Sequence, residues 1–268
     1  MGEFSSVMPS KEVFEVYAIR YATVERRASE NFIGGDPHEA GSSMDFFVWV
    51  ARSAQRVVVI DTGFNKVAAE TRKRTFLRCP SDGLAMLGVE AREVETVVLT
   101  HLHYDHAGNM SLFPNARFVI QDSEVAFATG RQMRHGFLRH AYDVEDVADL
   151  VRSVYAERVD FVDGSAELFP GMHVHHVGGH CAGLQIVRIW TRDGWLVLAS
   201  DATHYYANIE TQTPFPIVFD VGQMLAGFEK VRALADAPEL IVPGHDPEVM
   251  QRYAPPDSTM SGAVVRLA

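Results

Sequence analysis

The chain of 268 residues is poor in cysteine, in long apolar runs and in positive charge. Cys79 and Cys181 are its only cysteines, which excludes a fold built on disulfides. No apolar run approaches the ~20 residues that a membrane-spanning helix needs. Because Asp and Glu number 35 against 24 Lys and Arg, for a formal net charge of −11, a nucleic-acid groove is disfavoured.

The N-terminal segment 1–13 is polar and lacks the apolar stretch of a secretion signal. We expect residues 1–10 to be disordered or left over from cloning, and the protein to be cytoplasmic. No linker, repeat or low-complexity tract divides the chain, so one domain is predicted over residues 1–268. The predicted partner is a small molecule rather than a membrane or nucleic acid. The oligomeric state is left open, with a homodimer as a candidate.

Short β-type runs and helical stretches alternate along the chain. The predicted strands are 14–22, 46–51, 56–60, 96–99 and 117–120, then 159–162, 172–177, 184–190, 195–199 and 240–242 in a second strand-rich half. The predicted helices are 66–77, 84–87 and 220–235, with a mainly helical insertion over 123–154 near the site. This order predicts an α/β fold with two mixed sheets packed face to face and outer helices, an αββα sandwich.

The helix over 220–235 is expected to pack on the core. Asp220 can cap its first turn. Its apolar residues keep helical spacing and are expected on one buried face. These residues are Val221, Leu225, Phe228, Val231 and Ala235.

A cluster of potential metal ligands directly follows the apolar run 96–99. Three imidazoles and a carboxylate fall within the six residues 101–106, as His-Leu-His-Tyr-Asp-His. His101 and His103 project to the same side of extended backbone, and Asp105 and His106 can reach the same pocket from the turn. A strand that ends in such a loop predicts a site where metal ions activate water.

Three later residues share one feature, because each follows a predicted strand at a break marked by Gly or Asp. They are His180, Asp201 and His245. Ligands at strand ends converge on one edge of a sheet sandwich. Together with the first cluster, these residues offer more ligands than the three that a single catalytic zinc takes from the protein. The set therefore predicts two metal ions that share one carboxylate ligand.

This order of motifs resembles the metallo-β-lactamase superfamily over almost the whole chain, and within it the N-acyl homoserine lactonase branch. The strand-end Asp61-Thr62-Gly63 matches that family's Asp-Thr-Gly. The resemblance implies a first metal on His101, His103 and His180, a second on Asp105, His106 and His245, and Asp201 bridging both. It also implies that Asp61 and Thr100 orient ligand imidazoles through hydrogen bonds.

The function implied by the resemblance is that of a zinc-dependent hydrolase that opens a small lactone, as in quorum quenching. Two divalent ions, with zinc expected, would lower the pKa of water toward ~7. A bridging hydroxide would attack the ester carbonyl, and Asp105 is assigned a catalytic as well as a ligand role. His/Asp sites also accept manganese, iron or cobalt, so the ligand types leave the metal open.

One position departs from the lactonase pattern. The branch has a Tyr three residues after the bridging Asp, and this chain has His204 there. A neutral imidazole N–H can donate the same hydrogen bond to a substrate carbonyl, so His204 is predicted to contact substrate and act in catalysis. Tyr205 and His38 are further candidates for substrate contact.

Several alternatives remain open at this point. The same metals could serve another cyclic ester or amide, a thioester or a β-lactam. A di-iron redox site is disfavoured, because His103 stands where that pattern has Glu. A binding module with structural metals is disfavoured by the complete ligand set, since a structural site needs no open, water-bearing pair.

Overall fold

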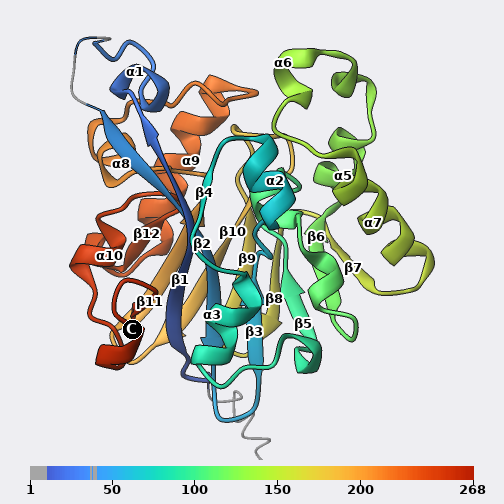
Figure 1. The fold of residues 1–268 in the computed structure, drawn as a ribbon, viewed down its shortest axis with the longest axis vertical. Coiled ribbons are helices and arrows are strands. Elements are labelled where there is room, and N and C mark those ends of the chain that lie inside the picture. Colours follow the sequence, from blue (N-terminus) through green and yellow to red (C-terminus); the bar gives the residue numbers. More distant parts are fainter. Residues whose placement is uncertain (1–10, 37, 39–40) are drawn as a thin grey trace, which may run out of the picture.

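The computed structural model describes residues 11–36, 38 and 41–268, and the segment 1–10 lies outside the described residues. Two mixed β-sheets pack together, and helices cover their outer sides (Figure 1). The predicted αββα sandwich is therefore confirmed. Within the described part of the chain, no helix has the length and hydropathy needed to cross a bilayer.

The first sheet has eight strands in the order β13-β1-β2-β3-β5-β6-β7, with β4 paired to β1. Its strands are β1 (Glu15–Arg26), β2 (Ser42–Arg52), β3 (Val57–Ile60), β4 (Thr75–Phe76), β5 (Thr96–Val98), β6 (Arg117–Gln121), β7 (Val159–Val162) and β13 (Val264–Arg266). β3, β5, β6 and β7 run parallel, so their carboxyl ends lie at one edge.

The second sheet has five strands in the order β12-β11-β10-β9-β8. They are β8 (Ser165–Phe169), β9 (Met172–His176), β10 (Gln185–Thr191), β11 (Gly194–Ser200) and β12 (Ile241–Pro243). β11 and β12 are parallel, whereas the other neighbours are antiparallel. The carboxyl ends of β11 and β12 therefore point the same way, toward the loops that carry the later site residues.

The helices are mostly short. They are α1 (Ala28–Asn31), α2 (Lys66–Thr71), α3 (Pro80–Met86), α4 (Tyr104–Ala107), α5 (Asp122–Ala128), α6 (Gly136–Arg139), α7 (Val144–Tyr155), α8 (Tyr206–Thr211), α9 (Val221–Leu234) and α10 (Val249–Arg252). α5, α6 and α7 form the expected helical segment and lie together on one flank of the molecule (Figure 1).

Strand β2 shows how the sandwich buries its sheets. Phe47 and Trp49 belong to one hydrophobic cluster, with Leu196 and Leu198 of β11, whereas Val48 and Val50 of the opposite face belong to another. Alternate residues of a strand point to opposite faces, so both faces of β2 are covered. A strand buried on both sides reads as a continuous apolar run, which is why 46–51 was recognisable in the sequence.

Two sequence predictions of secondary structure were wrong. The strand 159–162 was placed in the second half, but β7 pairs in parallel with β6 of the first sheet, because the helices between them cross back over that sheet. The helix predicted over 66–77 ends at Thr71. Lys73 has a left-handed φ of 56°, which ends the helix, and Thr75 and Phe76 then pair with β1.

The face of α9 also differs from the prediction. Asp220 does cap the helix by accepting a hydrogen bond from the Gln223 amide. However, Val221 and Leu225 are 43% and 38% exposed. The buried face consists of Met224, Gly227, Phe228 and Val231, because the sheet covers a narrower stripe than the apolar residues span.

Candidate metal centre

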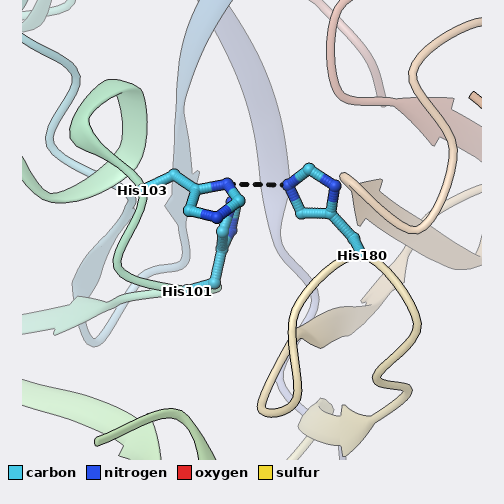
Figure 2. A group of neighbouring side chains, drawn as sticks. All are labelled: His101, His103 and His180. Atoms are coloured by element: carbon cyan, nitrogen blue, oxygen red, sulfur yellow. Dashed lines mark hydrogen bonds between the residues drawn. The ribbon is translucent and has the colours of Figure 1, made fainter. Parts of the chain in front are cut away.

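The predicted ligands gather at one edge of the sandwich. His101, His103, Asp105 and His106 follow β5, His180 lies between β9 and β10, Asp201 follows β11, and His245 follows β12. All of these side chains are buried, and the most exposed is Asp105 at 9%. Figure 2 shows His103 and His180 facing each other from two loops, with His101 beside them. His103 Nδ1 lies 2.8 Å from His180 Nε2.

Two compact groups of potential ligands result. One contains His101, His103 and His180, and the other contains Asp105, His106 and His245. Within each group, one ligand atom from every residue lies within 4.8 Å of the others. These are the sets that the sequence resemblance implies for a first and a second metal, and their role as ligands stays a prediction.

Asp201 lies between the two groups. Its Oδ1 is 3.3 Å from His106 Nε2 and 3.0 Å from His245 Nε2. Its Oδ2 is 3.2 Å from His180 Nε2. Because each carboxylate oxygen faces a different group, Asp201 has the placement that a bridging ligand requires.

Hydrogen bonds on the outer nitrogens fix the orientation of four imidazoles. The pairs are His101 Nδ1 with Thr100 Oγ1 at 3.0 Å, His106 Nδ1 with Asp61 Oδ2 at 2.7 Å, His180 Nδ1 with the Ile217 carbonyl at 2.7 Å, and His245 Nδ1 with the Asp45 carbonyl at 2.8 Å. Each Nδ1–H is thereby occupied, so Nε2 is the nitrogen that faces the centre, where His180 Nε2 also hydrogen-bonds to His103 Nδ1. Such bonds determine the tautomer that binds a metal ion.

Asp61 and Thr100 form the centre of this outer network. Asp61 accepts from the Thr100 amide at 2.7 Å and from the Thr100 hydroxyl at 2.8 Å, in addition to His106. Asp61 and Ser200 have left-handed φ values of 62° and 45°, which turn the chain sharply at the ends of β3 and β11. Ser200 Oγ lies 2.9 Å from Thr100 Oγ1 and was not singled out in the sequence.

The donor set fits a pair of divalent cations. His101 Nε2, His106 Nε2 and Asp201 Oδ1 are buried without a hydrogen-bond partner among the described residues. Burial lowers the pKa of His101 and His103 well below the ordinary value, which favours the neutral imidazole that binds metal. Burial also acts to lower the pKa of His106 and His245, but the nearby Asp201 raises both above the ordinary value, so a cation there would replace a proton. Burial opposes ionisation of Asp201, but the surrounding histidines hold its pKa well below its ordinary value. Buried unpaired lone pairs are costly unless a cation occupies the space between them.

A family model described as the metallo-beta-lactamase superfamily matches residues 46–245. The chain belongs to this superfamily. An N-acyl homoserine lactonase of Bacillus thuringiensis is 27% identical over 169 residues, which is 62% of this chain and 61% of that protein. The lactonase AiiB of Agrobacterium fabrum is 34% identical over 129 residues, 47% of this chain and 46% of its own length. The chain thus spans less than two thirds of these curated relatives.

Solved structures share the metallo-β-lactamase fold over nearly the whole chain. A quorum-quenching N-acyl homoserine lactone hydrolase superposes with a TM-score of 0.76 at 21% identity, covering 92% of this chain and 98% of that one. The dizinc quorum-quenching lactonase AidC gives a TM-score of 0.69 at 17% identity, covering 89% of each chain. At these identities the likeness shows the fold.

In this superfamily member, His204 directly contacts the candidate bridging carboxylate. Its Nε2 lies 2.9 Å from Asp201 Oδ2, and its ring stacks on Phe215 at a centroid distance of 3.5 Å. Burial lowers the pKa of His204 to about 3, so the imidazole is neutral. When Nε2–H donates to Asp201, Nδ1 is an acceptor. To donate a hydrogen bond to a substrate carbonyl, Nε2–H must therefore first break its hydrogen bond with Asp201.

The two other predicted substrate contacts lie elsewhere. Tyr205 is buried, and its hydroxyl donates to the Ser43 carbonyl at 3.1 Å. His38 is exposed in a loop. The cavity beside the metal centre is lined by His204 but by neither of these residues. Their contact with substrate stays a prediction.

Glu124 on α5 was missed by the sequence analysis, although it connects the two histidine loops. Its Oε1 accepts from the Leu102 amide at 3.0 Å and from the Tyr142 hydroxyl at 2.9 Å. Its Oε2 accepts from the Gly183 amide at 3.0 Å. A Cβ at Gly183 would lie 2.1 Å from the Glu124 amide nitrogen, so only glycine fits this approach. Glu124 thus holds the loops of His103 and His180 together.

Replacing Glu124 by glutamine should loosen this junction. An amide has one oxygen acceptor, so at least one buried donor loses its partner at a cost of about 1–3 kcal/mol. We expect Tm to fall by roughly 2–12 °C, and the metal affinity to fall about 10-fold or more. Calorimetry and metal titration would measure both, with the exposed Glu229→Gln on α9 as the control. Equal values for the two variants would contradict this role.

Proposed function

We propose that this chain is a dinuclear, metal-dependent hydrolase that opens the ring of a small lactone, with N-acyl homoserine lactones as the first substrates to test. The observation that carries the proposal is the placement of Asp201, whose oxygens face two separate buried His/Asp groups. Relatives named N-acyl homoserine lactonase support the substrate class. A role in quorum quenching, a single domain, a cytoplasmic location and a homodimer belong to the same set of proposals.

Zinc is the proposed metal, because three imidazoles in one group match the protein ligands of a catalytic zinc. When bound, the ions would polarise the ester carbonyl and lower the pKa of the attacking water toward ~7. The chain itself contributes rigid placement. Asp61, Thr100 and the carbonyls of Asp45 and Ile217 hold the imidazole rings, and burial keeps bulk water away from the centre.

The proposal is tested by hydrolysis assays on metal-loaded protein. We expect acid release in a pH-stat from N-acyl homoserine lactones, in proportion to the zinc content of the sample. Thioesters and β-lactams are included in the same panel. Turnover confined to thioesters or β-lactams would assign the centre to a different substrate class. If protein with two bound ions hydrolyses no compound of the panel, lactone hydrolysis is contradicted.

A further inference from the structure

Three arginines line the cavity that also exposes the candidate metal ligands. Arg26 is the last residue of β1, whereas Arg72 and Arg74 lie between α2 and β4. The same cavity is lined by His103, His180 and other residues of the centre. In Figure 1, α2 lies in the same half of the molecule as α1 and α6, below both. In a chain with a formal net charge of −11, this local excess of guanidinium groups is unexpected.

Among the described residues, the Arg74 guanidinium is anchored through Nε, and its two terminal nitrogens remain available for a ligand. Its Nε donates to the Tyr104 hydroxyl at 3.1 Å, and its Cζ lies 6.0 Å from the centre of the Phe46 ring. Among the described residues, its two terminal nitrogens have no hydrogen-bond partner within 3.5 Å. A guanidinium fixed in this way presents a free fork of donors to the cavity.

Among the described residues, Arg72 and Arg26 donate hydrogen bonds only to neutral acceptors. Arg72 donates to the carbonyls of His140 and Tyr142 and lies 3.8 Å from the centre of the Tyr104 ring. Arg26 donates to Met44 Sδ and to a backbone carbonyl of α1. These contacts position the side chains without neutralising their charge.

No carboxylate among the described residues lies within 4.0 Å of any of the three guanidinium groups, in contrast to Arg20, Arg52 and Arg56, which form ion pairs. Asp105 and Asp201 line the same cavity, but their oxygens face the imidazoles. Two divalent ions would compensate both carboxylates. Among the described residues, the half-buried arginines then have no ion-pair partner within 4.0 Å, although Asp146 acts on Arg72 from a greater distance. A bound anion would supply the missing close counter-charge.

We propose that the substrate carries a carboxylate besides its scissile ester, and that Arg74 binds this group, flanked by Arg72 and Arg26. A carboxylate matches the single free fork of Arg74, because its two oxygens accept two parallel N–H bonds. This inference rests on the proposed lactone hydrolysis and narrows its substrate class. It distinguishes the chain from an enzyme for lactones with purely aliphatic acyl groups, which offer no charge to these arginines.

The test uses matched pairs of lactones with the zinc-loaded protein. N-succinyl, N-glutaryl and N-adipoyl homoserine lactones are compared with the terminal amides of the same acyl chains, which have nearly the same size and no charge. We expect kcat/KM to be at least about tenfold higher for the acid of the best-fitting length, as for a charge-assisted pair of hydrogen bonds. Raising the salt concentration should reduce this preference.

Variants and a binding measurement separate the two proposals. Arg74→Gln should bring the acid-to-amide ratio close to 1, whereas Arg92→Gln, an exposed site near the amino end of β5, should leave the ratio as in the wild type. A wild-type ratio near 1, or an unchanged ratio in Arg74→Gln, would overturn the inference.

If no lactone is hydrolysed, the lactone proposal fails. Calorimetric binding of the ring-opened acids and amides then decides the carboxylate inference: tighter binding of the acids, abolished in Arg74→Gln, supports it, and equal binding overturns it.

Discussion

The variant Asp201→Asn is expected to lose at least about 10³-fold in kcat/KM, which corresponds to about 4 kcal/mol of transition-state stabilisation. The reason is geometric, since both oxygens of Asp201 face imidazole groups that belong to different candidate metal sites. An amide offers one neutral oxygen and one NH₂ group, so it cannot bridge two cations. Metal analysis should show fewer than two zinc ions per chain in the variant.

The matched control is Asp160→Asn, which makes the same chemical change on the surface strand β7, where Asp160 pairs with Arg117. Its turnover and zinc content should stay within about twofold of the wild type, because exposed ion pairs contribute little. If Asp201→Asn keeps its turnover and only its thermal stability falls, the metals are structural and the hydrolytic mechanism is wrong.

Removal of metal by a chelator is expected to abolish turnover and to lower the thermal stability markedly. Without cations, several buried polar atoms of the centre have no hydrogen-bond partner among the described residues, including His101 Nε2 and Asp201 Oδ1, and the carboxylates have only the imidazoles as counter-charges. At a metal concentration about 1,000 times Kd, each site adds about 4 kcal/mol, or roughly 8–16 °C in Tm for a domain of this size. Differential scanning calorimetry with and without EDTA measures this shift.

EDTA already saturated with zinc serves as the control, because its coordination sites are filled and it cannot remove zinc from the protein. Adding back zinc should restore both Tm and turnover, with two equivalents needed per chain. An unchanged Tm after complete removal of metal would show that the cluster does not hold cations in the folded protein, and would contradict the assignment of both groups.

The site was predictable in part because several of its residues are neighbours in the chain. Four ligands fall within six residues after a strand: His101, His103, Asp105 and His106. Residues so close in the chain stay close in space whatever the rest of the fold does. His180, Asp201 and His245 were recognisable because each follows a β-type run at a break. The ends of β strands in a sandwich meet at one edge, so their convergence was a sound expectation.

Other parts of the site are not indicated by any motif in the sequence. Glu124 lies in an ordinary helical stretch, and its importance comes from amides of two distant loops, those of Leu102 and Gly183. The carbonyls of Asp45 and Ile217 orient imidazoles, but a backbone carbonyl is the same in every residue. The strand β7 was assigned to the wrong sheet, because a run of apolar residues does not indicate its neighbours.

Local residue order alone was therefore enough to identify the layered α/β fold, the ligand types and the expectation of a paired-cation centre. These properties depend on hydrophobic period and on the spacing of residues within single segments. The three-dimensional path of the chain was needed for the rest: the placement of Asp201 between two groups, the contact of His204 with it, and the meeting of Arg26 with Arg72 and Arg74 around one cavity. Such contacts join segments far apart in the chain, and their distances depend on how the sheets, loops and helices pack together.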